Sequence, residues 1–216
     1  MIKHGVTSIG NYAFSHFENL IEADIPDSVT TIGNNAFLDC TSLTSVYIPD
    51  SVITIESGAF QMCKNLKSVY ISDNVSAIGD DVFSKCDSLR SVYIPDSVAT
   101  FGTAVFMSCH NLKSAYISEN VTSIGNHTFW ACKNLKNVNL PDSVITIGRS
   151  AFQWCRNLKT VNIPNSVTTI GNSAFSCCSN LKNVNIPDSV TTIGNSAFYS
   201  CTGLTSRSEE RRVGKE

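Results

Sequence analysis

One phrase recurs along this chain at a fixed interval of 23 residues, with no insertion. Near-copies of IPDSVTTIGNSAF, quoted from Ile186 to Phe198, fill most of the 216 residues. Columns of phenylalanine, valine and cysteine keep the same interval as a column of leucine. The leucine column consists of Leu20, Leu43, Leu66, Leu89, Leu112, Leu135, Leu158, Leu181 and Leu204. A fixed period of this length predicts a solenoid in which each copy forms one coil.

Each unit contains two segments with the alternation of a strand. In LTSVYI, Leu43 to Ile48, apolar and polar residues alternate as in a half-buried strand, and Pro49 then ends the pairing. VITI, Val52 to Ile55, predicts a second short strand. In Gly58 to Leu66 the apolar residues are spaced by one and three, which predicts a short helix or 3₁₀ turn.

Most second strands are followed by a glycine, as at Gly33, Gly79 and Gly125. We expect this glycine to turn the backbone through a positive φ, which glycine adopts without steric cost. The sequence of each unit therefore predicts a strand, a turn, a second short strand and a helical turn.

The consensus LxxVxIPDSVTTIGxxAFxxCxx, quoted from copies such as Leu181 to Gly203, resembles the BspA-type leucine-rich repeat. The resemblance implies an α/β repeat solenoid that is right-handed, with a parallel sheet on its concave face and short strands plus helical turns on the other sides. It also implies a cell-surface or secreted protein that acts in adhesion or recognition and has no catalytic residues.

The period also predicts the domain organisation. Residues 1–206 form the repeat array, with eight full repeats from Leu20 and partial repeats at both ends. Residues 207–216 are a charged segment outside the repeat, which we interpret as a disordered tail or an artefact of sequence assembly. Because the end coils are uncapped in this chain, we expect end-to-end self-association of the fragment.

The outward positions of the first strands are the candidate ligand-binding residues. On a leucine-rich repeat solenoid they line the concave face. They are Tyr47, Tyr70, Tyr93, Tyr116, Asn139, Asn162 and Asn185. Tyrosine supplies rigid amphipathic area and is frequent in recognition surfaces. The alternative is that tyrosine here only favours strands and stacks on itself.

Two charged rows border these positions. The basic row precedes the first strands and consists of Lys67, Arg90, Lys113, Lys136, Lys159 and Lys182. The acidic row follows them and consists of Asp27, Asp50, Asp73, Asp96, Glu119, Asp142 and Asp188. These rows serve solubility and protection of the sheet edge, or they steer a partner of mixed charge.

Nine cysteines suggest metal or redox chemistry, but eight share one column, and a metal site needs ligands that converge. We therefore expect buried free thiols, no metal and no cofactor. No phosphate loop, HExxH or GxSxG motif occurs, so an enzyme is not expected. A threonine column that includes Thr31 and Thr54 leaves an ice-binding surface as a weaker alternative.

A net charge of −2 argues against a nucleic-acid partner, and no apolar run is long enough for membrane insertion. Two functions remain open. The array binds a protein or glycan, in the extracellular matrix or on another cell surface, or it is a passive structural spacer within a larger surface protein. Trp130 and Trp154 mark a second contact patch or merely cover the convex side.

Overall fold

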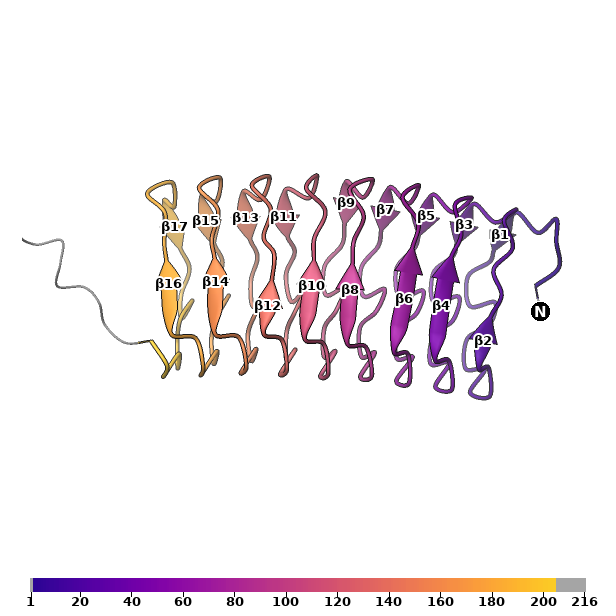
Figure 1. Ribbon diagram of the computed structural model, residues 1–216, viewed down its shortest axis with the longest axis horizontal. Coiled ribbons are helices and arrows are strands. Elements are labelled where there is room, and N and C mark those ends of the chain that lie inside the picture. Colours follow the sequence, from indigo (N-terminus) through magenta and orange to yellow (C-terminus); the bar gives the residue numbers. More distant parts are fainter. Residues whose placement is uncertain (1, 205–216) are drawn as a thin grey trace, which may run out of the picture.

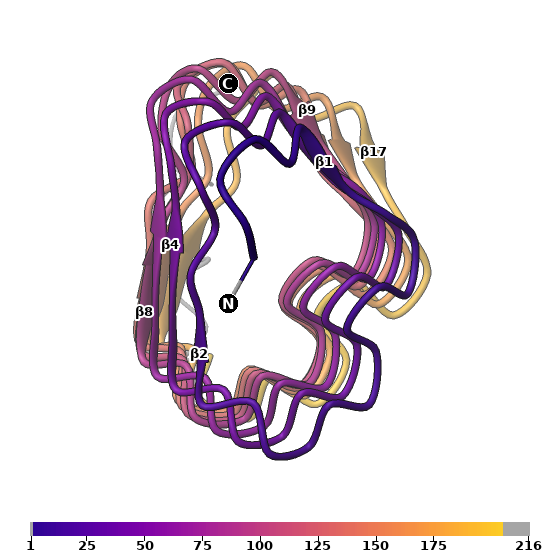
Figure 2. The same cartoon turned by 90° about the vertical axis from the view of Figure 1, so that its right-hand side faces the viewer.

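The computed structural model describes residues 2–204, which form one β-solenoid. Its coils stack in a single row from the N-terminal to the C-terminal end (Figure 1). Seen from the N-terminal end, the chain runs clockwise as it recedes, so the coil is right-handed (Figure 2). This is the usual hand of a crossover between parallel strands. The predicted solenoid of parallel strands is confirmed.

Each coil contributes to two rows of short strands. The first-strand sheet contains β2 (Glu22–Ala23), β4 (Ser45–Ile48), β6 (Ser68–Ile71), β8 (Ser91–Tyr93), β10 (Ser114–Tyr116), β12 (Asn137–Val138), β14 (Thr160–Asn162) and β16 (Asn183–Asn185). The second row contains β1 (Ser8–Ile9), β3 (Thr31–Ile32), β5 (Thr54–Ile55), β7 (Ala77–Ile78), β9 (Thr100–Phe101), β11 (Ser123–Ile124), β13 (Thr146–Ile147), β15 (Thr169–Ile170) and β17 (Thr192–Ile193). Both predicted strands of the unit are present but shorter than predicted.

All pairing is parallel, and each residue lies opposite its equivalent in the neighbouring coil, as Tyr47 lies opposite Tyr70. Hydrogen bonds join β2, β4 and β6, then β8, β10 and β12, and then β14 and β16. The first-strand sheet is therefore interrupted between β6 and β8 and between β12 and β14, although its strands form one row (Figure 1).

The segment from Gly58 to Leu66 and its equivalents consist of turns, so the predicted helical turn and the α component of the fold class are wrong. No helix occurs within residues 2–204. The N–H of Gln61 donates to the carbonyl of Gly58 at 2.9 Å, whereas those of Phe60 and Met62 donate to the next coil. Gly58 and Met62 also have positive φ, 66° and 63°. A helical ladder cannot form, because coil-to-coil bonds use alternate donors and left-handed residues recur.

The glycine after the second strand lies close to the preceding coil and does not have a positive φ, so our expectation for it is wrong. Among the described glycines only Gly5 and Gly58 have positive φ. A Cβ on Gly33 would lie 2.8 Å from the carbonyl oxygen of Ile9 in the preceding coil. Most coils have glycine here, but the equivalent position in one coil is Glu56, whose carboxylate accepts hydrogen bonds from Asn34 in the preceding coil.

The phenylalanine column forms the centre of the core as an unbroken stack of rings. Along the column, the ring contacts of Phe83 and Phe106 have centroid distances of 5.6–5.8 Å. The remaining contacts along the column are 5.1–5.3 Å. The coils of these two rings carry Val82 and Val105 where most coils have alanine. The larger β-branched side chains thus coincide with the wider spacing.

Candidate binding face

The four predicted tyrosines lie together on the outer surface of the first-strand sheet. Tyr47, Tyr70 and Tyr93 expose 56, 50 and 53 % of their surfaces, and Tyr116 is partly exposed. Of these four hydroxyls only that of Tyr116 has a side-chain partner within residues 2–204, Glu119, to which it donates at 3.5 Å. The other three hydroxyls face solvent with no partner in the described part of the chain.

The tyrosine row consists of two stacked pairs. The rings of Tyr47 and Tyr70 stack at 4.9 Å with an angle of 5°. Those of Tyr93 and Tyr116 stack at 4.8 Å with an angle of 12°. Within the described residues no ring contact joins the two pairs, which lie on opposite sides of the interruption between β6 and β8. Each pair therefore forms its own aromatic platform.

The three asparagines of the predicted site continue the same face. Asn139, Asn162 and Asn185 are exposed, and Asn162 lies opposite Asn185 in the parallel pairing of β14 and β16. Their side-chain amides form no hydrogen bond within residues 2–204. The amides can therefore donate to and accept from a ligand. The face thus changes along the array from aromatic to purely polar.

Three residues of the basic row line a hollow at the edge where β6, β8 and β10 begin. This hollow has a volume of 300 Å³ and is lined by Lys67, Ser88, Arg90, Asn111 and Lys113. The three cations are exposed and form no ion pair within residues 2–204. An anionic group of a partner would meet several charged donors here. Ser88 and Asn111 were missed from sequence, although the 23-residue interval places them two positions before members of the basic row.

The acidic row lies exposed along the opposite edge. Partial desolvation in the stacked pair raises the pKa of Tyr47, and the charges of Asp50, Tyr70 and Asp27 raise it further. The pKa of Tyr116 is also raised, first by desolvation and then by Asp96 and Glu119. Both hydroxyls therefore keep their protons at neutral pH and act as hydrogen-bond donors.

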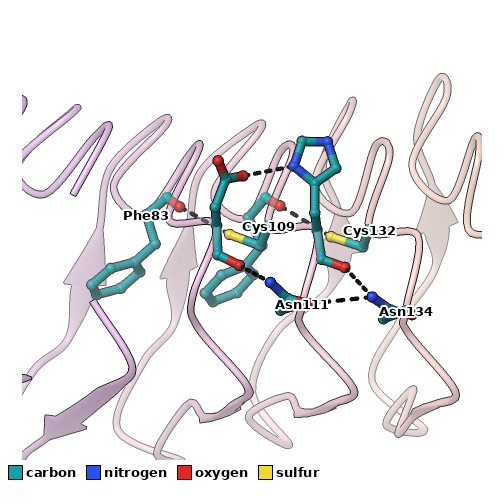
Figure 3. A network of polar contacts seen from close by, with 8 residues as sticks. Phe83, Cys109, Asn111, Cys132 and Asn134 are labelled. Atoms are coloured by element: carbon teal, nitrogen blue, oxygen red, sulfur yellow. Dashed lines mark hydrogen bonds and ion pairs between the residues drawn. The ribbon is translucent and has the colours of Figure 1, made fainter. Parts of the chain in front are cut away.

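The cysteine column lies inside the coils and links them. Each thiol donates to the carbonyl oxygen of the phenylalanine in the preceding coil, as Cys109 does to Phe83 and Cys132 does to Phe106, both at 3.1 Å (Figure 3). Outside this column, Asn111 and Asn134 form a parallel ladder of amide hydrogen bonds (Figure 3). Cysteine is therefore a small donor that satisfies a buried carbonyl.

Burial raises the pKa of all eight thiols in the column, to about 11 for Cys40 and beyond that for the fully buried Cys109. All nine cysteines are free, and Cys177 alone is partly exposed. Within residues 2–204 no group of three or more histidine, cysteine or acidic side chains could hold a metal ion. A search of those residues also finds no helix of the length and hydropathy needed to cross a membrane.

Comparisons with solved structures agree with this architecture. A leucine-rich repeat protein from Bacteroides ovatus has a TM-score of 0.76 and 30% identity over 94% of this chain and 58% of its own. The leucine-rich repeat protein of T. pallidum has a TM-score of 0.66 and 28% identity, covering 92% of this chain and 83% of its own. A Eubacterium ventriosum protein, at 21% identity, shares the fold with a TM-score of 0.69 over 96% of this chain and 70% of its own.

The chain thus spans less than two thirds of the Bacteroides ovatus protein. A search of curated proteins gave no match. The family model described as "BspA type Leucine rich repeat region (6 copies)" matches residues 1–113 and 100–211. With the family model and the structural neighbours in agreement, the chain belongs to the BspA-type leucine-rich repeat family.

Proposed function

We propose that this array is a non-enzymatic recognition module whose first-strand face binds an extracellular protein or glycan. The observation that carries the proposal is the pair of tyrosine platforms. Three of the four rings are half exposed, and their hydroxyls have no partner within the described residues. Such rings offer apolar area and a donor at low entropic cost, because each is already held by its stacked neighbour.

The polar surroundings support the same face. A ligand that lies along the strand direction meets unpaired cations at one edge, tyrosines or asparagines in the middle and carboxylates at the other edge. Charges of both signs favour a partner of complementary mixed charge, and they raise the rate of association more than the final affinity. Family membership supports a role in protein interaction or as a structural repeat. We propose a cell-surface or secreted location from the same resemblance.

The test uses residues 1–206 and a variant with Tyr47, Tyr70, Tyr93 and Tyr116 all changed to Asn, the residue that later coils carry at this position. Both proteins are screened against extracellular-matrix proteins and glycans, after circular dichroism has shown that both are folded. We expect the parent to bind and the variant to lose binding at least tenfold. Equal binding by both proteins, or none by either, would favour the passive spacer.

The end coils give a specific reason to propose self-association as well. Tyr12, Phe17 and Ile21 are exposed in the first coils, and Ile193 and Tyr199 are exposed in the last. Within residues 2–204 no further coil covers these apolar surfaces or the backbone groups beside them. Light scattering over a concentration series should show a mass that rises with concentration, and a constant monomer mass would overturn this proposal.

A further inference from the structure

Both tryptophans of the chain line one hollow on the side of the solenoid formed by the turns, away from the first-strand face. The hollow has a volume of 360 Å³ and is lined by His110, Trp130, Ala131, Lys133, Trp154 and Arg156. Trp130 and Trp154 are 24 residues apart, so the coil interval places them in adjacent coils and adjacent columns. The period alone therefore brings together two large aromatic side chains from variable positions.

The hollow is held in shape by contacts between its own residues. The indole N–H of Trp130 donates to Oε1 of Gln153 at 3.1 Å, which links its coil to the next. The Arg156 guanidinium lies 5.0 Å from the ring centroid of Trp154, a distance at which a cation is attracted to the ring. Both tryptophans remain partly exposed. They therefore offer fixed aromatic surface to a ligand.

The charge of the hollow is positive. Nδ1 of His110 lies 2.6 Å from Oδ1 of Asp87, so this histidine already has an acidic partner. Lys133 and Arg156 form no ion pair within residues 2–204. Lys133 and Arg156 occupy the same column as His110, in the next coil and in the one after it. A ligand with a negative group would gain a charge-assisted hydrogen bond that the described chain does not itself supply.

Most backbone donors around the hollow are already bonded within the chain. The N–H of Trp130 donates to the His127 carbonyl, and that of Ala131 donates to the Gln153 carbonyl at 2.7 Å. The N–H of Lys133 is bonded as well, to the Ala131 carbonyl. Ring faces and cationic side chains are therefore the main groups that the hollow offers to a ligand.

We propose that this hollow binds an anionic sugar residue, a pyranose that carries a carboxylate or a sulfate. A pyranose ring has an apolar C–H face that packs on an indole, and its acidic group would lie against Lys133 and Arg156. Most binding pockets combine apolar walls with a few placed polar groups in this way. The site is separate from the first-strand face and does not depend on it.

The tryptophans themselves report on the site, because the chain has no others. Tryptophan fluorescence of the full chain is titrated with a glucuronic-acid oligosaccharide, a heparin-derived oligosaccharide and a neutral cello-oligosaccharide. We expect a saturable change with at least one acidic sugar, at least tenfold weaker binding of the neutral sugar, and weaker binding at higher salt. Equal binding of the neutral sugar, or no saturable change with either acidic sugar, would overturn the proposal.

The variants use residues that other coils carry in the same columns, so the fold should tolerate them. Arg156→Thr, which copies Thr41 and Thr202, should weaken binding about tenfold while both fluorophores remain. Trp154→Ser, which copies Ser108 and Ser200, should abolish it with Trp130 as reporter. The control Lys64→Thr changes the same column outside the hollow and should have no effect. An acidic tyrosine peptide that binds tighter than either acidic sugar would refute the sugar assignment.

Discussion

The phenylalanine column and the tyrosine row are two aromatic series with the same 23-residue interval and different behaviour. The phenylalanine rings stack without a break from Phe14 to Phe198. The tyrosine rings stack only as two pairs, separated where the hydrogen bonding between β6 and β8 stops. Inside the solenoid each ring is confined by the coils on both sides. On the outside, contact depends on local strand pairing.

This difference separates what holds the fold from what is free to bind. Seven phenylalanines of the column are at most 1% exposed, and thiol hydrogen bonds beside them cross from coil to coil. Three of the four tyrosines are half exposed, and β14 and β16 keep the strand with asparagine at this position, although β12 ends just before Asn139. We therefore expect changes to inner columns to cost stability and changes to the outer row to cost little.

The largest effect should come from raising the pH above 9.0, the ordinary pKa of these thiols. Burial raises the folded-state pKa of Cys40 to about 11, so between these values the unfolded chain releases a proton that the folded chain keeps. The stabilising contribution is therefore complete below pH 9 and is lost as pH rises, by about 1.4 kcal/mol per unit for each such thiol.

Urea unfolding from about pH 7 to about pH 10 measures this slope. Cys109→Ala should reduce it by the contribution of one thiol. The lost hydrogen bond to Phe83 should also lower stability at neutral pH by about 1 kcal/mol. A free energy of unfolding that stays constant across this range would mean that the column is not shielded from water as the structure shows.

The next largest effect should come from one inner ring compared with one outer ring. Phe106→Ala should lower the free energy of unfolding by about 3–5 kcal/mol, because it opens a cavity within the stack. Tyr93→Asn should lower it by less than about 1 kcal/mol, since equivalent coils already carry asparagine. Chemical denaturation of both variants measures these two losses of unfolding free energy. Losses of similar size would contradict the distinction between the inner and the outer rings.

A smaller effect should follow from Gly171→Ala. A Cβ there would lie 2.7 Å from the backbone nitrogen of Arg149 in the preceding coil, so the backbone of one coil must shift. We expect a loss of about 1–3 kcal/mol by thermal or urea unfolding. Gly10→Ala is the matched control, because no atom lies within 4 Å of a Cβ at this equivalent position in the first coil. Equal losses would show that close approach is not the reason for glycine.

The smallest effect should separate the two halves of the tyrosine row. A double-mutant cycle on Tyr47 and Tyr70 should give a coupling energy of about 0.5–1.5 kcal/mol from the stacked rings. The same cycle on Tyr70 and Tyr93 should give a value near zero. A similar coupling energy between Tyr70 and Tyr93 would mean that the four rings form one continuous row in solution.

The period was sufficient to predict the solenoid and the columns of the core, because equivalent residues must stack in a repeat, and the family resemblance implied the parallel strands. It was misleading for Gly58 to Leu66, since apolar spacings of one and three suit a helix and a series of turns equally well. The choice between a helix and a series of turns depends on which backbone donors bond to the next coil, and this is a property of the tertiary structure. Here the N–H groups of Phe60 and Met62 donate to the next coil, so the segment forms turns.

The candidate face was predicted only in outline. The interval places Tyr47, Tyr70, Tyr93 and Tyr116 in one row, and the structure agrees. The interruption after β6 could not be predicted, because the same strand pattern occurs on both sides of it. That the sheet is concave and that it binds a partner stay predictions. The expected segment 207–216 lies outside the described residues.

The most direct test of this account is the stability of the variant in which all four tyrosines are changed to asparagine. If the outer row is not needed for the fold, urea unfolding should show a single transition with a loss smaller than that of Phe106→Ala alone. A loss as large as that of the inner ring, or a second transition, would contradict the account, because the tyrosines would then be part of what holds the coils together.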